Sequence, residues 1–291
     1  MQNLQKLLQV ILFISLFSAC TKNEKTPAAN NLTLHFNNTF KDKTIVLGDK
    51  NSTTATVNTS ASGQVHRFSE LKYVISNIRL VTTAGKEVPY NINDLDKGAT
   101  IVDHSKPQTL DYVLTNIPSG EYKQLKFGLG VKQELNTLDE VKFPKFYAAA
   151  GANKTWMMWE WGTGYRFTKI EGFYDTDNKQ MSIHTGSTVD GKENDPSTWK
   201  QGVDAYRDIT LPLSTIAVVG FKAPKINIKA DFDKLLSGKT NTIKLKTGNG
   251  MEDNATPNIH HSIEMRKFVD NLGGNGTSDI TGIFSVTSVE N

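Results

Sequence analysis

Residues 156–172, WMMWEWGTGYRFTKIEG, give the strongest indication of the fold, because three of the chain's four tryptophans fall within the first six of them. Aromatic residues are enriched in strands, where side chains alternate between two faces. A strand here places Met157, Trp159 and Trp161 on one face with Tyr165. The segment therefore predicts either an aromatic core strand or a platform of tryptophan rings that stacks on sugars.

Short segments with period-two alternation lie on both sides of this stretch, and Gly, Pro, Asn and Asp residues separate them. Further strands are predicted at residues 32–36, 43–47, 71–81, 121–131, 180–184, 209–213, 226–230, 242–245 and 282–288. Apolar spacing predicts helices only at residues 231–236 and 263–272. Many short strands with isolated helices favour an all-β fold, a β-sandwich of immunoglobulin-like or related type, in one domain over residues 32–291.

The amino-terminal segment has the pattern of a bacterial lipoprotein signal. Residues 7–17 are apolar except for two positions, which is too short a run to span a bilayer but fits a secretory signal. The sequence FSAC at residues 17–20 looks like a lipobox, and Cys20 is the only cysteine in the chain. We expect a signal peptide over residues 1–19, lipidation of Cys20 and a flexible tether over residues 20–31. That places the domain in the cell envelope, anchored to the outer membrane.

Composition and motifs exclude several functions. The formal charge is only +3 and no basic run is present, so nucleic acid is not an expected partner. The sequence lacks a Gly-x-Ser-x-Gly motif, a phosphate-binding loop, a dinucleotide fingerprint and a helical zinc-protease pair. One cysteine allows no internal disulfide. We therefore expect a binding protein and not an enzyme.

Several motifs occur in a fixed order that resembles a known family. Residues 157–167 (MMWEWGTGYRF) follow a Met-x-Trp-x-Trp-x-x-Gly-Tyr-x-Phe pattern, and residues 184–186 (HTG) supply the His-x-Gly that comes after it. Residues 73–80, residues 117–131 and the helix ending at residues 268–271 match other landmarks. Over residues 32–288 the chain is similar to the MbnP-like copper-binding proteins.

The resemblance implies an exported, mainly β protein that binds copper through histidine imidazoles. It also implies that a tryptophan, here Trp159 or Trp161, can be oxidised to kynurenine by a partner haem enzyme. Imidazole suits copper, and a kynurenine amine adds a weak nitrogen donor. Met157 and Tyr165 are expected to line the site. One departure is that some relatives carry a histidine two residues after the modified tryptophan, where this chain has Trp161.

The candidate metal ligands are four of the six histidines. His184 lies on the family motif and follows the aromatic segment. His260 and His261 precede the C-terminal helix, and in an extended segment they point to opposite faces, so one of them, with a slight preference for His261, is expected to face the site. His66 lies in a predicted strand and is also retained as a candidate.

These inferences combine into an exported copper-binding lipoprotein that acts in copper acquisition or storage. Two other functions stay open. One is a cell-surface module that binds glycans or another ligand on a tryptophan platform. The other is a family member that has lost the metal and acts as an interaction protein.

Overall fold

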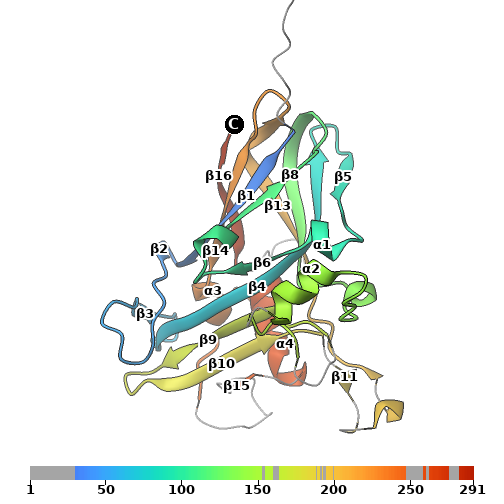
Figure 1. The fold of residues 1–291 in the computed structure, drawn as a ribbon. Coiled ribbons are helices and arrows are strands. Elements are labelled where there is room, and N and C mark those ends of the chain that lie inside the picture. The colour runs from blue at the N-terminus through green and yellow to red at the C-terminus, as the bar shows by residue number, and fades with distance from the viewer. Residues whose placement is uncertain are drawn as a thin grey trace, which may run out of the picture.

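The computed structural model describes residues 30–152, 155–159, 164–187, 189–190, 192, 195–198, 200–246, 258–259, 262–274 and 282–291. Their strands form two main sheets and a separate two-stranded hairpin, with only short helices between them (Figure 1). The predicted all-β sandwich is therefore confirmed.

The larger sheet is built around one long strand, β4. Its order is β13 (Arg207–Val219), β8 (Gly120–Leu129), β4 (Val65–Thr82), β9 (Thr168–Tyr174), β10 (Lys179–Thr185) and β15 (Asn258–Ile259), and β3 (Asn58–Thr59), β5 (Glu87–Tyr90) and β6 (Thr100–Asp103) also pair with β4. The smaller sheet has the order β16 (Phe284–Glu290), β14 (Lys225–Asp231), β1 (Leu32–Phe40) and β2 (Lys43–Thr44), and β7 (Asp111–Leu114) pairs with β1. The hairpin consists of β11 (Val189–Asp190) and β12 (Lys200–Gln201).

The helical segments are short except for the last one. They are α1 (Leu95–Gly98), η1 (Pro107–Thr109), η2 (Gln133–Leu135), α2 (Pro144–Tyr147), η3 (Ala148–Ala152), η4 (Pro196–Thr198), α3 (Asp233–Leu236) and α4 (Ser262–Gly273). α3 and α4 confirm the two predicted helices. Among the described residues, no helix has the length and apolar character needed to cross a membrane.

Aromatic side chains from both sheets meet in the core. Tyr73 and Phe127 project from the larger sheet, and Phe36 and Phe284 project from the smaller one. The ring centroids of Phe36 and Tyr73 are 5.9 Å apart, and those of Phe127 and Phe284 are 5.2 Å apart. Both pairs are edge-to-face, the arrangement that aromatic quadrupoles favour. The Tyr73 hydroxyl donates to Asn38 Oδ1 at 2.8 Å, so its polar end is satisfied inside the core.

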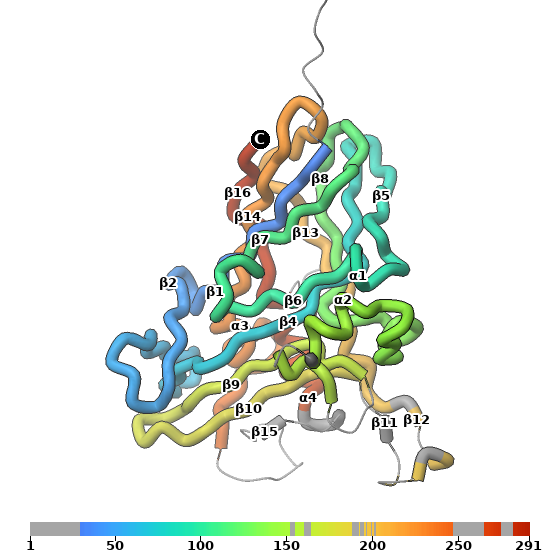
Figure 2. The backbone as a smooth tube through the Cα atoms, in the orientation of Figure 1, coloured from blue at the N-terminus to red at the C-terminus, as the bar shows by residue number. Residues whose placement is uncertain are grey.

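β4 changes the face of its side chains at a β-bulge. Its first half pairs with β9 and its second half with β8, so it links the two ends of the sheet (Figure 2). The register with β9 shifts between Phe68 and Glu70. A bulge inserts an extra residue, and the alternation therefore changes phase. Phe68 lies in the core before the shift, and Leu71 and Tyr73 lie there after it. Glu70 and Lys72 consequently point away from the sandwich core.

The aromatic segment is not the regular strand that its composition predicts. β9 begins only at Thr168, and Met158 and Tyr165 form an isolated antiparallel bridge. The Trp156 backbone has φ +58°, which is outside the β region. The predicted alternation of burial nevertheless holds in part, because Met157 and Trp159 are buried and Trp156 is 55% exposed.

Candidate metal centre

Six polar side chains form two rows across β4, β9 and β10, on the face opposite the apolar core. One row contains Glu70, Glu171 and Ser182, and the other contains Lys72, Lys169 and His184. Lys72, Lys169 and His184 are all at most 8% exposed. Residue types that are usually exposed are therefore buried here, which requires compensation by neighbouring charges.

Ion pairs supply that compensation, both between neighbouring strands and along single strands of the ladder. Lys169 Nζ donates to Glu70 Oε2 at 2.9 Å and lies 3.5 Å from Glu171 Oε1. Lys72 Nζ lies 2.5 Å from Glu70 Oε1. Residues directly opposite each other carry like charges, an arrangement that is unfavourable by itself. The diagonal pair of Lys169 with Glu70 and the two pairs within single strands offset that repulsion and keep both ammonium groups paired.

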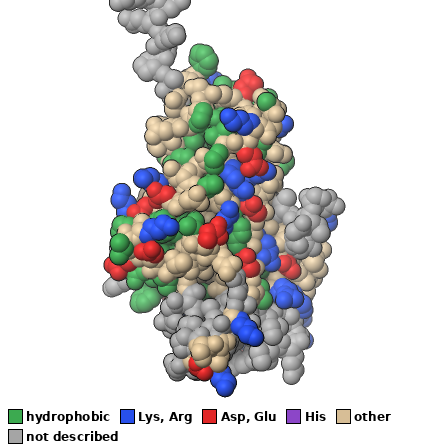
Figure 3. All heavy atoms as spheres, turned by 90° about the vertical axis from the view of Figure 1, so that its right-hand side faces the viewer, with side chains coloured by type: hydrophobic (Ala, Val, Ile, Leu, Met, Phe, Trp, Pro, Cys, Tyr) green, Lys and Arg blue, Asp and Glu red, His purple; other side chains and the backbone are tan. Residues whose placement is uncertain are grey.

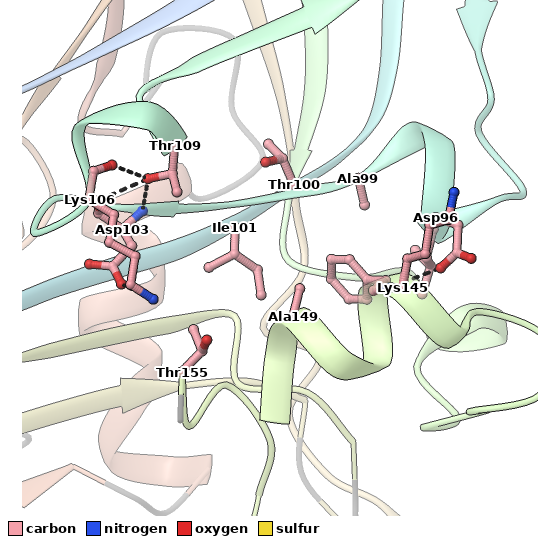
Figure 4. A pocket seen from close by; sticks show the side chains of 12 residues that line it. Asp96, Ala99, Thr100, Ile101, Asp103, Lys106, Thr109, Lys145, Ala149 and Thr155 are labelled. Carbon is pink, nitrogen blue, oxygen red and sulfur yellow. Dashed lines mark hydrogen bonds and ion pairs between the residues drawn. The ribbon is translucent and has the colours of Figure 1, made fainter. Parts of the chain in front are cut away.

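The charged rows continue to a cavity beside the aromatic segment. Lys72 Nζ donates to the Thr155 carbonyl at 3.1 Å and lies 3.7 Å from Asp103 Oδ2. The same Asp103 oxygen lies 3.5 Å from Lys106 Nζ. Asp103, Lys106 and Thr155 line a cavity of about 360 Å³ that extends to Lys145 (Figure 4). The polar face therefore runs from this cavity across the sheet to His184.

His184 is held by the carboxylate of Glu171. The distance between His184 Nε2 and Glu171 Oε1 is 2.9 Å, and Ser182 Oγ lies 3.2 Å from the same nitrogen. Burial lowers the pKa of His184, so the imidazole is neutral near pH 7. The hydrogen bond from His184, together with Lys169, lowers the pKa of Glu171 to about 2. A neutral imidazole oriented by a carboxylate is the arrangement found in metal-ligating histidines, and it makes Nδ1 the candidate donor atom.

Trp159 packs beside His184 under a guanidinium group. The two ring centroids are 6.4 Å apart, and Arg166 Cζ lies 5.1 Å from the centroid of the indole. A Cβ atom on Gly186 would lie 2.8 Å from Trp159 Nε1. Only glycine fits at that approach. This gives a physical reason for the His-x-Gly motif. The ring of His184 lies next to the indole of Trp159, and Gly186 has no side chain that would collide with it.

Backbone hydrogen bonds fix the segment that carries Trp159. The Trp159 amide donates to the Gly164 carbonyl at 3.0 Å, and the Arg166 amide donates to the Met157 carbonyl at 2.8 Å. Arg166 Nη1 also donates to the Trp156 carbonyl at 2.8 Å. Trp159 is only 2% exposed. Its indole therefore cannot serve as a sugar-stacking surface, and among the described tryptophans only Trp156 exposes its ring.

Met157 and Tyr165, which were expected to line the site, lie in the hydrophobic core beneath it. Both are fully buried. The rings of Tyr165 and Phe146 are 5.0 Å apart in an edge-to-face contact, and burial raises the pKa of the Tyr165 hydroxyl to about 12. Both side chains belong to the hydrophobic core and not to the polar face that carries His184.

The structure separates His66 from His184. His66 lies opposite Tyr174 on β9, whereas His184 lies opposite Lys169, five residues away. At a rise of about 3.3 Å per residue this is roughly 17 Å along the strand. His66 also lies on the core side of the bulge, with Phe68. The structure therefore does not bring His66 together with His184.

The other predicted site residues, Cys20, Trp161, His260 and His261, lie outside the described residues. β15 ends one residue before His260 and pairs in parallel with β10, with Ile259 opposite Ile183. Within the described part of the chain, no group of three or more His, Cys, Asp or Glu side chains could hold a metal ion. Of the two candidate histidines that the structure describes, His184 lies beside Trp159 and His66 does not.

Sequence reasoning missed two residues that surround His184 and Trp159, namely Glu171 and Arg166. A signal for Glu171 was present in the pattern Glu-x-Lys at residues 70–72 and Lys-x-Glu at residues 169–171. Antiparallel pairing of these two segments places like charges opposite each other, and unlike charges then meet on the diagonal, as Glu70 and Lys169 do. No comparable pattern identified Arg166, because its contacts depend on the irregular path of the aromatic segment.

Comparisons with known proteins agree with this architecture. The family profile described as MbnP matches residues 29–272. The solved structure of MbnP from Methylosinus trichosporium has a similar fold, with a TM-score of 0.54 and 15% sequence identity over 88% of this chain and 97% of that one. No curated protein matches the sequence. At this identity the structural likeness shows the fold alone, whereas the profile covers most of the sequence. The chain belongs to the MbnP family.

Proposed function

We propose that the chain is an exported copper-binding protein and that His184 is one of its ligands. Membership of the MbnP family supports a copper-linked role. The observation that carries the proposal is the arrangement of His184, which is buried, neutral, hydrogen-bonded to Glu171 at 2.9 Å and packed beside Trp159. Copper accepts imidazole ligands, and a pre-oriented ring binds with little reorganisation.

The second ligand in this proposal is His260 or His261. Ile259 of β15 lies opposite Ile183 of β10. His260 directly follows Ile259 in the sequence, as His184 directly follows Ile183. This connectivity supports His260 at least as well as His261, which the sequence pattern slightly favours.

Trp159 is the tryptophan that we propose becomes oxidised, with Trp161 as the alternative. Its ring lies next to that of His184. Conversion of the indole to kynurenine supplies an amine nitrogen that can bind copper weakly. The conversion cleaves the C2–C3 bond of the indole, releases C2 as formate and consumes dioxygen or peroxide, and a partner haem enzyme is its proposed catalyst.

The location follows from Cys20. We propose that residues 1–19 are removed, that Cys20 is lipidated and that residues 20–31 tether the domain to the outer membrane. A lipidated Cys20 is no longer a thiolate ligand, so copper has to be held by histidine, methionine or a modified tryptophan. Binding at the cell envelope fits copper acquisition or storage and needs no catalysis.

A metal-free interaction protein remains the second candidate, and one observation favours it. Arg166 lies 5.1 Å from the Trp159 ring centroid, and Lys169 lies opposite His184. Both cations oppose binding of another positive ion at this place. The glycan-binding alternative has less support, since Trp159 is buried.

Copper titration of the full chain tests the proposal. We expect one tight equivalent of cuprous or cupric ion in the wild-type chain, and no tight binding in the His184→Ala variant. The His35→Ala variant is the control, because His35 lies on the smaller sheet and is hydrogen-bonded to Asp111 there. Trace metal in the wild-type chain would support the metal-free alternative, and equal binding by both variants would exclude His184.

Intact mass of protein from its native host tests the tryptophan modification separately. Oxidation at Trp159 or Trp161 is expected to change the intact mass. After digestion, the change is expected only in the peptide that contains both residues. An unmodified peptide in copper-loaded protein would rule out the modification and leave the histidine site untouched.

A further inference from the structure

The end of the domain where the described chain begins is formed by two turns. We call these turns, residues 116–119 and 220–224, the domain tip. The Ile117 amide donates to the Asn30 carbonyl at 2.9 Å, and the Ser119 hydroxyl donates to Asn30 Oδ1 at 3.2 Å. The Thr33 amide donates to the Pro224 carbonyl at 2.9 Å. Both turns are therefore attached to the start of the described chain.

The second turn presents a large apolar side chain to solvent. Phe221 is 93% exposed, although a phenylalanine normally gains stability from burial. Gly220 has φ +115°, and its amide approaches the Lys222 carbonyl at 3.2 Å, which closes a tight turn. A Cβ atom on Gly220 would lie 2.6 Å from Ser119 Oγ, so the two turns are in close contact. The backbone therefore holds Phe221 outward.

The composition of the domain tip suits a lipid surface. Phe221 and its neighbours Lys222 and Ala223 are exposed, as is Pro118 in the first turn. Lys222 is the only charged residue in the two turns. Exposed phenylalanine can be buried at the headgroup–acyl boundary of a bilayer, and lysine can extend its ammonium group toward lipid phosphates. Figure 3 shows hydrophobic side chains at this end of the molecule.

We infer that the domain tip contacts the membrane surface, with Phe221 inserted at the headgroup level and Lys222 on the phosphates. The inference rests on the proposed lipid anchor at Cys20. Asn30 lies ten residue steps after Cys20, and so short a chain reaches at most about 36 Å. The tether keeps the domain tip close to the bilayer, so a contact there forms at a high effective concentration.

This orientation has a consequence for the metal centre. β9 and β10 lie at the far end of the molecule from the turn between β13 and β14 (Figure 1). With the domain tip on the membrane, His184 faces away from the bilayer, where a soluble partner can reach it.

Spin labelling of the lipidated full chain tests the contact. A nitroxide at Ala223→Cys in vesicles of phosphatidylethanolamine and phosphatidylglycerol is expected to be accessible to oxygen and protected from a soluble nickel chelate. The control is a label at Val141→Cys, because Val141 is 94% exposed and lies outside the domain tip. Adding Phe221→Ser to the Ala223→Cys chain is expected to abolish the protection. Equal nickel accessibility at both label positions would overturn the inference.

The outcomes can be separated from failure of the proposed function. Mass analysis of the amino-terminal peptide shows whether Cys20 carries lipid. If it does not, a Cys20→Ser chain with the same label is mixed with excess vesicles. Protection of the nitroxide from the nickel chelate would then support membrane contact by the domain tip, and full accessibility would contradict it. Copper content of the same samples is expected to be unchanged by Phe221→Ser.

Discussion

The two faces of the β4–β9–β10 ladder are both buried, but different forces bury them. On the core face, Leu71, Ile170 and Ile183 belong to the hydrophobic core and are fully buried. On the opposite face, Lys169 and His184 are buried only because carboxylates pair with them. Hydrophobic transfer stabilises the first face, whereas the second face has to balance desolvation against Coulomb attraction.

The difference indicates where function is to be found. A buried apolar face needs no explanation beyond stability. A buried charged face contributes little net stability, because desolvation offsets most of the attraction between its charges. Its retention next to a neutral histidine and a buried tryptophan is the reason for assigning the metal centre to this face.

Substitution on the core face is expected to have the largest effect on stability. Ile170→Ala removes a fully buried side chain and should lower the free energy of unfolding by about 3 to 4 kcal/mol. Ile216→Ala, at a 42% exposed position, should change it by about 0.5 kcal/mol. Urea unfolding measures both. Copper bound per folded molecule should stay at the wild-type level in both variants. Loss of copper in Ile170→Ala would contradict the claim that the core face serves stability alone.

His66, on the core face, should make stability depend on pH. Burial lowers its pKa to about 4, and the unfolded imidazole titrates near 6.5. The unfolded state therefore binds the proton first, so stability is lost as pH falls from about 6.5 to 4, by up to about 3 kcal/mol. His66→Leu should flatten this part of the profile in urea unfolding at several pH values. A profile parallel to that of the wild-type chain would contradict the assignment.

Glu70 probes the charged face. Its carboxylate pairs with both Lys72 and Lys169, and Glu70→Gln leaves two buried ammonium groups with fewer partners. We expect a loss of about 2 kcal/mol, less than for a fully buried pair because Glu70 is 21% exposed. Glu87→Gln, which breaks an exposed pair with Lys126, should cost less than about 1 kcal/mol. Equal losses of unfolding free energy in the two variants would mean that the ion pairs of the charged face stabilise the fold no more than an exposed pair does.

Gly186 tests the fit of the indole beside His184. A Cβ atom there would collide with Trp159, so Gly186→Ala should displace the ring, change tryptophan emission and lower stability by about 1 to 2 kcal/mol. Gly85→Ala is the control, because Gly85 has open space but φ +88°. It should show a cost of about 1 kcal/mol from the backbone with unchanged emission. Unchanged emission in both variants would remove the explanation of the His-x-Gly motif.

Much of the fold could be predicted from local patterns. The alternation at residues 32–36 and 226–230 and the apolar spacing of α4 reflect burial of one face, which is a property of single segments. β5, β6 and β7 were missed because each has only four residues and its pairing depends on β4 or β1. The continuous length of β4 was also missed, since its bulge interrupts the period-two pattern.

The candidate site was predictable only in part. His184 and Trp159 were identified through their motif, and their proximity is confirmed. The separation of His66 from His184 could not be predicted, because it depends on the bulge between Phe68 and Glu70, which changes the face that a side chain occupies. The cation near the indole, Arg166, depends on an irregular backbone that strand periodicity does not describe.

Anomalous diffraction at the copper edge, from crystals of the copper-loaded full chain, tests the central claim most directly. The account predicts one strong anomalous peak on the charged face, within bonding distance of His184 Nδ1 and next to Trp159. A peak beside His66 or on the smaller sheet, with none near His184, would contradict it.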